Sequence, residues 1–243
     1  MTVWVVTGTG TEIGKTVTTA ALAAVAVRAG RSVAVLKPAQ TGVAPDEPGD
    51  VAEVVRLAGE QVTGVELARY PEPLAPGTAA ARAGLAPVGP AEIAEAAAKL
   101  AASHDLVLVE GAGGLLVHLD GQGSTLADAA RLIGAPVVVV ARAGLGTLNS
   151  VQLTAEALRA RGLTQAGVVI GAWPRDPGLA ERCNVADLPK VAGAALLGAV
   201  PEASGGLSAD RFRASAGGWV APELGGVWDG AAFARRWGSA GEF

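Results

Sequence analysis

Residues 7–16 read TGTGTEIGKT and lie between a β-branched apolar run at 3–7 and an Ala-rich segment at 15–28. The run predicts a buried strand, and the helical spacing of the segment predicts a helix. A glycine-rich turn between a strand and a helix is the setting of a phosphate-binding loop, in which Lys15 reaches phosphate oxygens and Thr16 can ligate Mg²⁺. Gly8 lies one residue too early for the strict GxxxxGK[ST] spacing. An ordinary glycine-rich turn is therefore the alternative.

Further apolar runs and helical segments alternate along the chain, which predicts an α/β fold with a doubly wound, mainly parallel sheet of the P-loop NTPase type and helices on both faces. We expect one domain over residues 1–237 and a tail or cloning scar at 238–243. Beyond Pro201 only residues 229–237 suggest a helix. The other expected strands are 33–36, 106–109, 136–141, 168–170 and 196–200. The other expected helices are 90–102, 126–132 and 148–161. We expect the Pro-rich stretches 43–49 and 71–77 to be loops near the site.

Composition narrows the function classes. The net charge is −4 and no long Lys/Arg cluster occurs, so the sequence offers no footprint for nucleic acid or an anionic membrane. No apolar stretch approaches the roughly 20 residues that span a bilayer. The single cysteine, Cys183, cannot form an intramolecular disulfide. These features predict a cytoplasmic protein without nucleic-acid or membrane partners.

Three charged residues follow predicted strands or loops, where ligands of parallel α/β sheets bind. Lys37 opens the segment KPAQTG and is expected to enter a loop beside the phosphate-binding loop, with a solvated surface lysine as the alternative. Glu110 precedes four residues that include three glycines and can hold Mg²⁺, although a turn carboxylate is the alternative. Asp50 is a second metal candidate with an equally good role as a helix cap. Trp173 could line a base pocket or simply pack in the core.

Taken together, TGTGTEIGKT, KPAQTG, Asp50, VEGAGGLLV and GLGTLNS resemble dethiobiotin synthetase in order and separation, over residues 1–201. The resemblance implies a homodimer that makes the ureido ring of dethiobiotin from 7,8-diaminopelargonate, CO₂ and a nucleoside triphosphate, with Mg²⁺. In that chemistry a carbamate of the substrate attacks the γ-phosphoryl group. No protein nucleophile is needed, and the enzyme supplies positioning and charge neutralisation.

The resemblance also implies roles for individual residues. Lys15, Lys37 and Thr11 would surround the carbamate and γ-phosphate, and Thr16, Asp50 and Glu110 would hold Mg²⁺. Thr41 would contact the diamine, while Leu145, Gly146, Thr147 and Asn149 would form a helix start that binds the substrate carboxylate across the dimer interface. The implied nucleotide-binding residues are Gly8, Thr9, Gly10, Thr11, Glu12, Ile13, Gly14, Lys15, Thr16, Val17, Glu110, Gly111, Gly113, Gly171 and Pro201.

Two departures and three alternatives accompany this resemblance. Many family members have Asp at the position of Gly10, and residues 171–174 read GAWP where an adenine-reading Asn is common, so the base preference stays open. A partitioning or septum-placement ATPase would carry a signature lysine near Gly10. An amidotransferase related to cobyrinic acid amide synthases would need a glutaminase nucleophile, for which only Cys183 is available. A non-enzymatic nucleotide-binding module would not need two lysines and two carboxylates.

Overall fold

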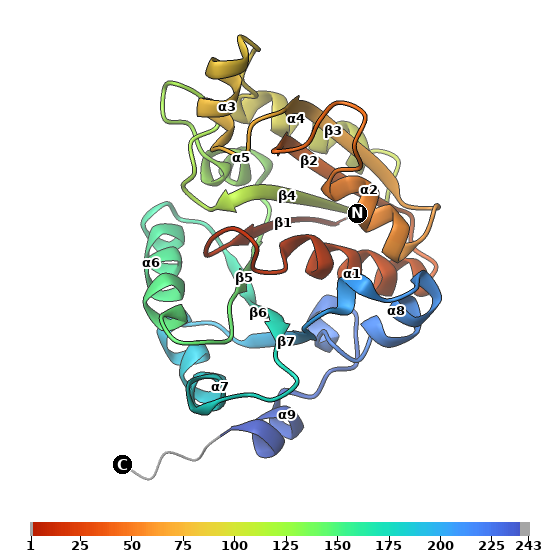
Figure 1. Cartoon of the computed structure of the whole chain (residues 1–243), viewed down its shortest axis with the longest axis vertical. Coiled ribbons are helices and arrows are strands. Elements are labelled where there is room, and N and C mark those ends of the chain that lie inside the picture. The colour runs from red at the N-terminus through yellow and green to blue at the C-terminus, as the bar shows by residue number, and fades with distance from the viewer. Residues whose placement is uncertain (1, 239–243) are drawn as a thin grey trace.

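The computed structural model describes residues 2–238, in which seven strands form one sheet (Figure 1). The order across the sheet is β3-β2-β4-β1-β5-β6-β7, and all the strand pairings are parallel. The strands are β1 (Thr2–Gly8), β2 (Val33–Thr41), β3 (Thr63–Tyr70), β4 (Leu106–Gly114), β5 (Val137–Ala141), β6 (Gln165–Trp173) and β7 (Leu196–Pro201).

Helices cover both faces of this sheet. Parallel strands are joined by right-handed crossovers, so the direction in which the chain moves along the sheet decides the face on which each helix lies. From β1 the chain moves outward to β2 and β3, and from β3 onward it moves the opposite way, through β4 and β5, to β7. The helices are α1 (Lys15–Arg28), α2 (Asp50–Ala58), α3 (Pro76–Ala83), α4 (Pro90–Ala101), α5 (Leu126–Ile133), α6 (Thr147–Ala160), α7 (Leu179–Ala192), α8 (Ala209–Ala216) and α9 (Gly230–Trp237), with short 3₁₀ turns at Ser204–Gly206 and Pro222–Leu224.

The contacts between helices agree with these directions. Helices α1, α2 and α8 pack on one another over one face, while α4 packs with α5 and α6 with α7 on the other (Figure 1). The doubly wound α/β prediction is therefore confirmed. The single-domain expectation for residues 1–237 stays a prediction, and the tail expected at 238–243 lies outside the described residues apart from Gly238. No helix within residues 2–238 is both long and apolar enough to cross a membrane.

The predicted strands and helices are present, with differences that have physical causes. Strand β2 runs five residues past its apolar part to Thr41, and β4 runs to Gly114. Strand β3 was not predicted, because this edge strand is only half-buried and carries charged residues within TGVELARY. Helix α7 contains Pro189 and was missed, as were α8 and α3. The loop expected at 71–77 ends early, because Pro76 begins α3.

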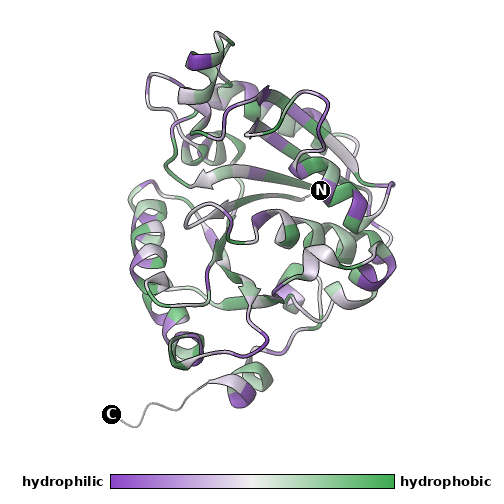
Figure 2. Cartoon of the chain, in the orientation of Figure 1, coloured by the Kyte–Doolittle hydropathy of each residue, from purple (hydrophilic) through white to green (hydrophobic). Residues whose placement is uncertain are grey.

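The core consists of the strands and the inner sides of the helices, and it ends where the site begins. Figure 2 shows β4 hydrophobic over its first half and pale at its tip, where glycines replace its buried valines and leucines. Pairing of β2 with β4 ends at Leu36 and Val109, although both strands continue. The two strands thus separate at their carboxyl ends, beside the turn that follows β1, which is where doubly wound sheets bind ligands.

Candidate active site

The glycine-rich turn after β1 has the form of a phosphate-binding loop. The N–H of Thr9 donates to the carbonyl of Val140 on β5, so the start of the loop is fixed to the sheet. The loop ends at Gly14, which has a φ of 88° and precedes the first residue of α1, Lys15. The Lys15 side chain turns back across the loop, and its ammonium donates to the carbonyl of Gly10 at 2.7 Å. The free N–H groups of a helix start and a lysine therefore face one small space.

The glycines in and beside this loop differ in how much space a side chain would have at each position. A Cβ on Gly14 would lie 2.2 Å from the carbonyl oxygen of Gly171 on β6, and one on Gly171 would lie 2.0 Å from the oxygen of Ile13. The loop therefore packs directly on the β6 backbone. A Cβ on Gly8 would lie 2.7 Å from the Ile13 side chain. Gly10 has open space, because a Cβ there would meet no atom within 4 Å.

Lys37 is the centre of the polar cluster in this cleft. It lies inside β2 and is 3% exposed, so the expectation that it enters a loop was wrong. Its ammonium lies 2.6 Å from Asp50 Oδ2 and 3.0 Å from Glu110 Oε1, and it also donates to the carbonyl of Gly111 at 3.1 Å. The two carboxylates come from the start of α2 and from β4. The structure thus joins three residues that are far apart in the sequence.

Asp50 is not the cap of its helix, and Glu110 lies in a strand and is not a turn carboxylate. The cap of α2 is Gly49, and Asp50 is the first helical residue, with its side chain directed to Lys37. Glu110 is 1% exposed and accepts from Thr16 Oγ1 at 2.9 Å, while its second oxygen, Oε2, is buried without a partner among the described residues. Buried polar atoms are normally satisfied by protein, water or an ion.

A magnesium ion fits this donor set. One hydroxyl and two carboxylates are the hard oxygen ligands that Mg²⁺ prefers, and the unpartnered oxygen of Glu110 offers a free lone pair. Mg²⁺ usually takes only one or two carboxylates from a protein and completes its shell with water and substrate phosphate. The predicted metal ligands, Thr16, Asp50 and Glu110, converge on one cluster around Lys37.

The two lysines differ in their electrostatics. Burial lowers the pKa of Lys15, and repulsion from Lys37 lowers it further, against smaller opposing effects of the carboxylates. Burial also acts to lower the pKa of Lys37, but attraction to Glu110 and Asp50 and the hydrogen bonds to them outweigh it, so this pKa is raised. Lys37 is therefore a firmly held cation. Lys15 is the cation that gains most from an added anion.

These groups line one cleft of about 780 Å³. Glu12 lies at its edge, exposed, with a φ of 54° that is uncommon for residues other than glycine. Segments 40–43 and 73–76 also line this cleft. The cleft brings together the predicted residues Thr11, Glu12, Ile13, Gly14, Lys15, Thr16, Val17, Lys37, Thr41, Asp50 and Gly113.

Other predicted residues lie around the cleft without lining it. Gly171 supports the loop from beneath, and the exposed Pro201 ends β7. Trp173 is 6% exposed and packs against Phe233 of α9, with ring centroids 4.9 Å apart, so its packing role is confirmed. Gly8 ends β1, Thr9 and Gly10 follow it in the loop, and Glu110 and Gly111 lie on β4.

The predicted carboxylate-binding residues also lie outside the lining of this cleft. Gly146 caps α6 with a φ of 91°, and Leu145 beside it is 95% exposed. Thr147 begins the helix and is buried, with a hydroxyl that has no partner among the described residues, while Asn149 is exposed. None of these residues lines the cleft, and Leu145 and Asn149 at this helix start are exposed.

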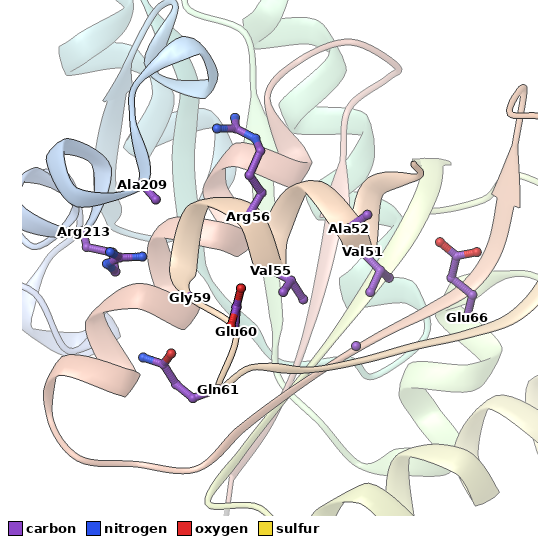
Figure 3. A pocket seen from close by; sticks show the side chains of 11 residues that line it. Val51, Ala52, Val55, Arg56, Gly59, Glu60, Gln61, Glu66, Ala209 and Arg213 are labelled. Carbon is purple, nitrogen blue, oxygen red and sulfur yellow. The ribbon is translucent and has the colours of Figure 1, made fainter. Parts of the chain in front are cut away.

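A larger hollow of about 1130 Å³ lies elsewhere, between α2, β3 and α8 (Figure 3). Val51 and Val55 contribute apolar side chains, and Arg56, Glu60 and Arg213 contribute charges of both signs. None of the residues of the phosphate-binding loop lines this hollow. The chemistry therefore belongs to the smaller cleft.

Several residues that hold the site in place were not predicted from the sequence. The buried Asn184 of α7 donates to the carbonyls of Ala143 and Gly144, just before α6. Arg142 donates to the carbonyl of Thr11 at 3.3 Å. Gln40 accepts from the N–H of Asp50, and its place inside KPAQTG was the one available signal.

A glycine-rich loop between a buried strand and a helix, with a lysine and a threonine at the helix start and acidic residues on adjacent elements, defines a P-loop nucleoside triphosphatase. A family model described as an AAA domain matches residues 2–205. The ATP-dependent dethiobiotin synthetase BioD of Streptomyces avermitilis is 71% identical over 234 residues, which cover 96% of this chain and 98% of the relative. The protein of the same name from Streptomyces coelicolor is 64% identical, over 98% of this chain and 100% of the relative. The chain belongs to the ATP-dependent dethiobiotin synthetase family.

Two solved structures of other proteins have a similar fold. The septum site-determining protein MinD of Pyrococcus horikoshii, complexed with Mg-ADP, has a TM-score of 0.59 at 18% identity, covering 93% of this chain and 95% of that chain. A ParA family ATPase from Chlorobium tepidum has a TM-score of 0.55 at 12% identity, covering 87% and 90%. At these identities the likeness establishes the shared fold alone.

Proposed function

We propose that this protein is an ATP-dependent dethiobiotin synthetase, which forms the ureido ring of dethiobiotin from 7,8-diaminopelargonate, CO₂ and ATP in biotin synthesis. One observation supports the proposal most strongly: Lys37 is buried between Asp50 and Glu110, next to a phosphate-binding loop that presents Lys15. This cluster concentrates positive charge and metal ligands where a carbamate and a γ-phosphate would meet. The identity of 71% to a relative of that name supports the same reaction.

The reaction needs charge neutralisation more than a protein nucleophile. An amine of the substrate captures CO₂ as a carbamate, and a carbamate oxygen attacks the γ-phosphorus, which breaks the bond to ADP. The second amine then attacks the carbonyl carbon of the mixed anhydride, closes the ring and releases phosphate. Lys15 and the loop N–H groups would hold the phosphates, and Lys37 and Thr11 would stabilise the carbamate and the transferred group.

The metal ligands in this proposal are Thr16, Asp50 and Glu110. When bound, Mg²⁺ neutralises phosphate charge and orients the β- and γ-phosphates for in-line transfer. The residues themselves fix one another in advance, since Thr16 and Lys37 share the same oxygen of Glu110. Lys37 therefore stays correctly oriented through contacts on two sides, which favours a preorganised site.

The base preference is a finer part of the proposal. The name of the relatives and the fold support ATP as the co-substrate. Gly171 offers only backbone groups for reading a base, and its Cα is pressed against the phosphate-binding loop. Recognition of adenine would then depend on backbone groups near the ends of β6 and β7, including Gly171 and Pro201.

We also propose a cytoplasmic homodimer in which the diaminopelargonate carboxylate binds to the partner's α6 start. A helix N-terminus can bind a carboxylate without a basic side chain. The substrate carboxylate would be surrounded by Leu145, Gly146, Thr147 and Asn149. Thr41 would contact the diamine end of the substrate. Leu145 and Leu153, both on or next to α6, are 95% and 58% exposed. Contiguous exposed apolar patches mark interaction surfaces, and these two leucines would contribute to one in the proposed dimer.

The test is an assay of purified protein with diaminopelargonate, bicarbonate, Mg²⁺ and each nucleoside triphosphate in turn, in which the dethiobiotin mass is measured. Phosphate release should require diamine and CO₂ together. Nucleotide hydrolysis that is equal with and without the diamine, with no dethiobiotin formed, would reject the proposal and favour a switch ATPase of the MinD or ParA kind.

A further inference from the structure

The connector between β2 and α2, residues 42–49, delivers Asp50 to the cleft. Two side chains at the ends of neighbouring strands hold this connector. Gln40 lies on β2, and its directly paired residue on β3 is Arg69. We propose that Gln40 and Arg69 are positioning residues that place Asp50 for the metal site. The inference rests on the proposed function insofar as Asp50 is a metal ligand there.

The Gln40 side chain caps the N-terminus of α2. The first N–H groups of a helix have no intrahelical acceptor, and a side chain at the cap position usually provides one. The cap residue of α2 is Gly49, which has no side chain to offer. Gln40 Oε1 instead accepts from the N–H of Asp50 at 2.8 Å, and Gln40 Nε2 donates to the carbonyl of Thr41 at 3.2 Å. Both ends of a side chain that is only 4% exposed are therefore used.

The packing around Gly49 shows how closely the connector is applied to this side chain. A Cβ on Gly49 would lie 2.7 Å from Gln40 Oε1 and 2.8 Å from Glu66 Oε1. A residue other than glycine would force these two side-chain ends or the connector to shift. The glycine thus permits the contact through which Gln40 reaches the Asp50 backbone.

Arg69 holds the same connector from its other side. One guanidinium nitrogen donates to the carbonyls of Ala44 and Glu47, at 2.9 and 2.5 Å. The other two nitrogens bind both oxygens of Glu66, three residues earlier on β3. A forked guanidinium that is fixed by a carboxylate orients its remaining donors with little loss of freedom. The connector therefore cannot move without breaking contacts to two strands.

This placement matters because Asp50 itself is less enclosed than its partners. Its side chain is 36% exposed, whereas those of Lys37 and Glu110 are 3% and 1% exposed. Its ion pair with Lys37 is 2.6 Å long and fixes the carboxylate, but the backbone position depends on the connector. Groups that orient metal ligands commonly change metal affinity by about 10- to 100-fold when they are removed.

The decisive variants are Gln40→Met, which removes the acceptor at similar length, and Gln40→Glu, which keeps an acceptor. Gln165→Met is the matched control, because Gln165 lies at the amino end of β6, away from the cleft. Amide exchange at Asp50 is measured in the ligand-free protein. Mg²⁺ affinity is measured by calorimetry with a non-hydrolysable ATP analogue bound, and the KM for the diamine is measured alongside.

We expect Gln40→Met to speed exchange of the Asp50 amide and to weaken Mg²⁺ binding about tenfold. Gln40→Glu, which keeps the acceptor for the Asp50 N–H but loses the donor to Thr41, should recover part of both, and Gln165→Met should change neither. Arg69→Met should weaken Mg²⁺ binding in the same direction, while Arg213→Met on α8 should not. An unchanged Asp50 amide and unchanged Mg²⁺ affinity in Gln40→Met would overturn the inference, as would a rise in the diamine KM alone. Failure of the wild-type protein to make dethiobiotin would instead count against the proposed function.

Discussion

The backbones of Gly14 and Gly171 meet so closely that a Cβ on Gly14 would lie 2.2 Å from the Gly171 carbonyl oxygen. This contact locks the phosphate-binding loop onto β6. Gly171→Ala should therefore force the loop to shift, because its Cβ would lie 2.0 Å from the oxygen of Ile13. We expect a loss of about 1–3 kcal/mol in unfolding free energy, as for other overpacked sites, together with weaker nucleotide binding. Denaturant unfolding and calorimetric titration measure the two effects.

Gly10→Ala is the matched control for this substitution, because it lies in the same loop and a Cβ there would meet no atom within 4 Å. Its stability should stay within about 0.5 kcal/mol of the wild type. Equal losses of unfolding free energy in Gly171→Ala and Gly10→Ala would contradict the claim that the contact with β6 is what excludes a side chain.

The two lysines should carry most of the charge stabilisation during phosphoryl transfer. Lys15→Ala or Lys37→Ala should each lower kcat by about 10²- to 10³-fold, by analogy with the loss of one preorganised donor. Lys190→Ala is a suitable control, since Lys190 pairs with Asp187 on the surface. Near-normal turnover in Lys37→Ala would mean that the buried cation serves only to balance Asp50 and Glu110.

Glu110→Gln tests the metal site and the ion pair together. The amide cannot supply the second anionic ligand, so the Mg²⁺ concentration for half-maximal activity should rise. Removing one partner of a buried pair typically costs about 3–5 kcal/mol, and because Lys37 keeps Asp50 we expect less than about 3 kcal/mol here. Mg²⁺ titration of activity and thermal unfolding separate the two effects. An unaltered Mg²⁺ requirement would assign Glu110 a structural role alone.

The pKa values of the two lysines are shifted in opposite directions, so their effects are lost in different pH ranges as the pH rises. The raised pKa of Lys37 means that its stabilising effect is complete below the unfolded-state pKa and is lost as the pH rises through the folded-state pKa. The pKa of Lys15 is lowered, so nucleotide affinity should fall as the pH rises through that lowered pKa, and phosphate binding should be accompanied by proton uptake there. Calorimetry in buffers of different ionisation enthalpy measures this uptake, and Lys15→Met should abolish it. Uptake that persists in Lys15→Met would assign the proton to another group.

A shared site predicts complementation between two inactive parents. Lys15→Ala disables phosphate binding, and an Asn149 variant disables binding of the substrate carboxylate. In a shared active site, Lys15 would come from one subunit and Asn149 from its partner. Each heterodimer would hold one intact site of two, so heterodimers should show about half of the wild-type activity and a randomly assembled mixture about a quarter. Mixed dimers that form readily and stay inactive would place both residues in the same subunit's site.

The sequence was most informative where structure is local. The TGTGTEIGKT motif located β1, the loop and α1 correctly, because a strand, a turn and a helix follow one another within 30 residues. The sequence wrongly predicted that Lys37 lies in a loop, because the apolar run that stops at Leu36 suggested that the strand ends there. A lysine can stay in the buried part of β2 only because Asp50 and Glu110 arrive from distant positions. The roles of Gln40 and Asn184 likewise depend on tertiary contacts.

The most direct measurement uses bicarbonate labelled with ¹⁸O under single-turnover conditions. If the carbamate oxygen attacks the γ-phosphorus in the Lys15–Lys37 cleft, the released phosphate must carry one oxygen from CO₂, and the dethiobiotin carbonyl must carry another. We expect one ¹⁸O per phosphate, dependent on the diamine and lost in step with product in Lys37→Ala. Phosphate that takes its new oxygen from water, with no label from CO₂, would contradict the proposed reaction.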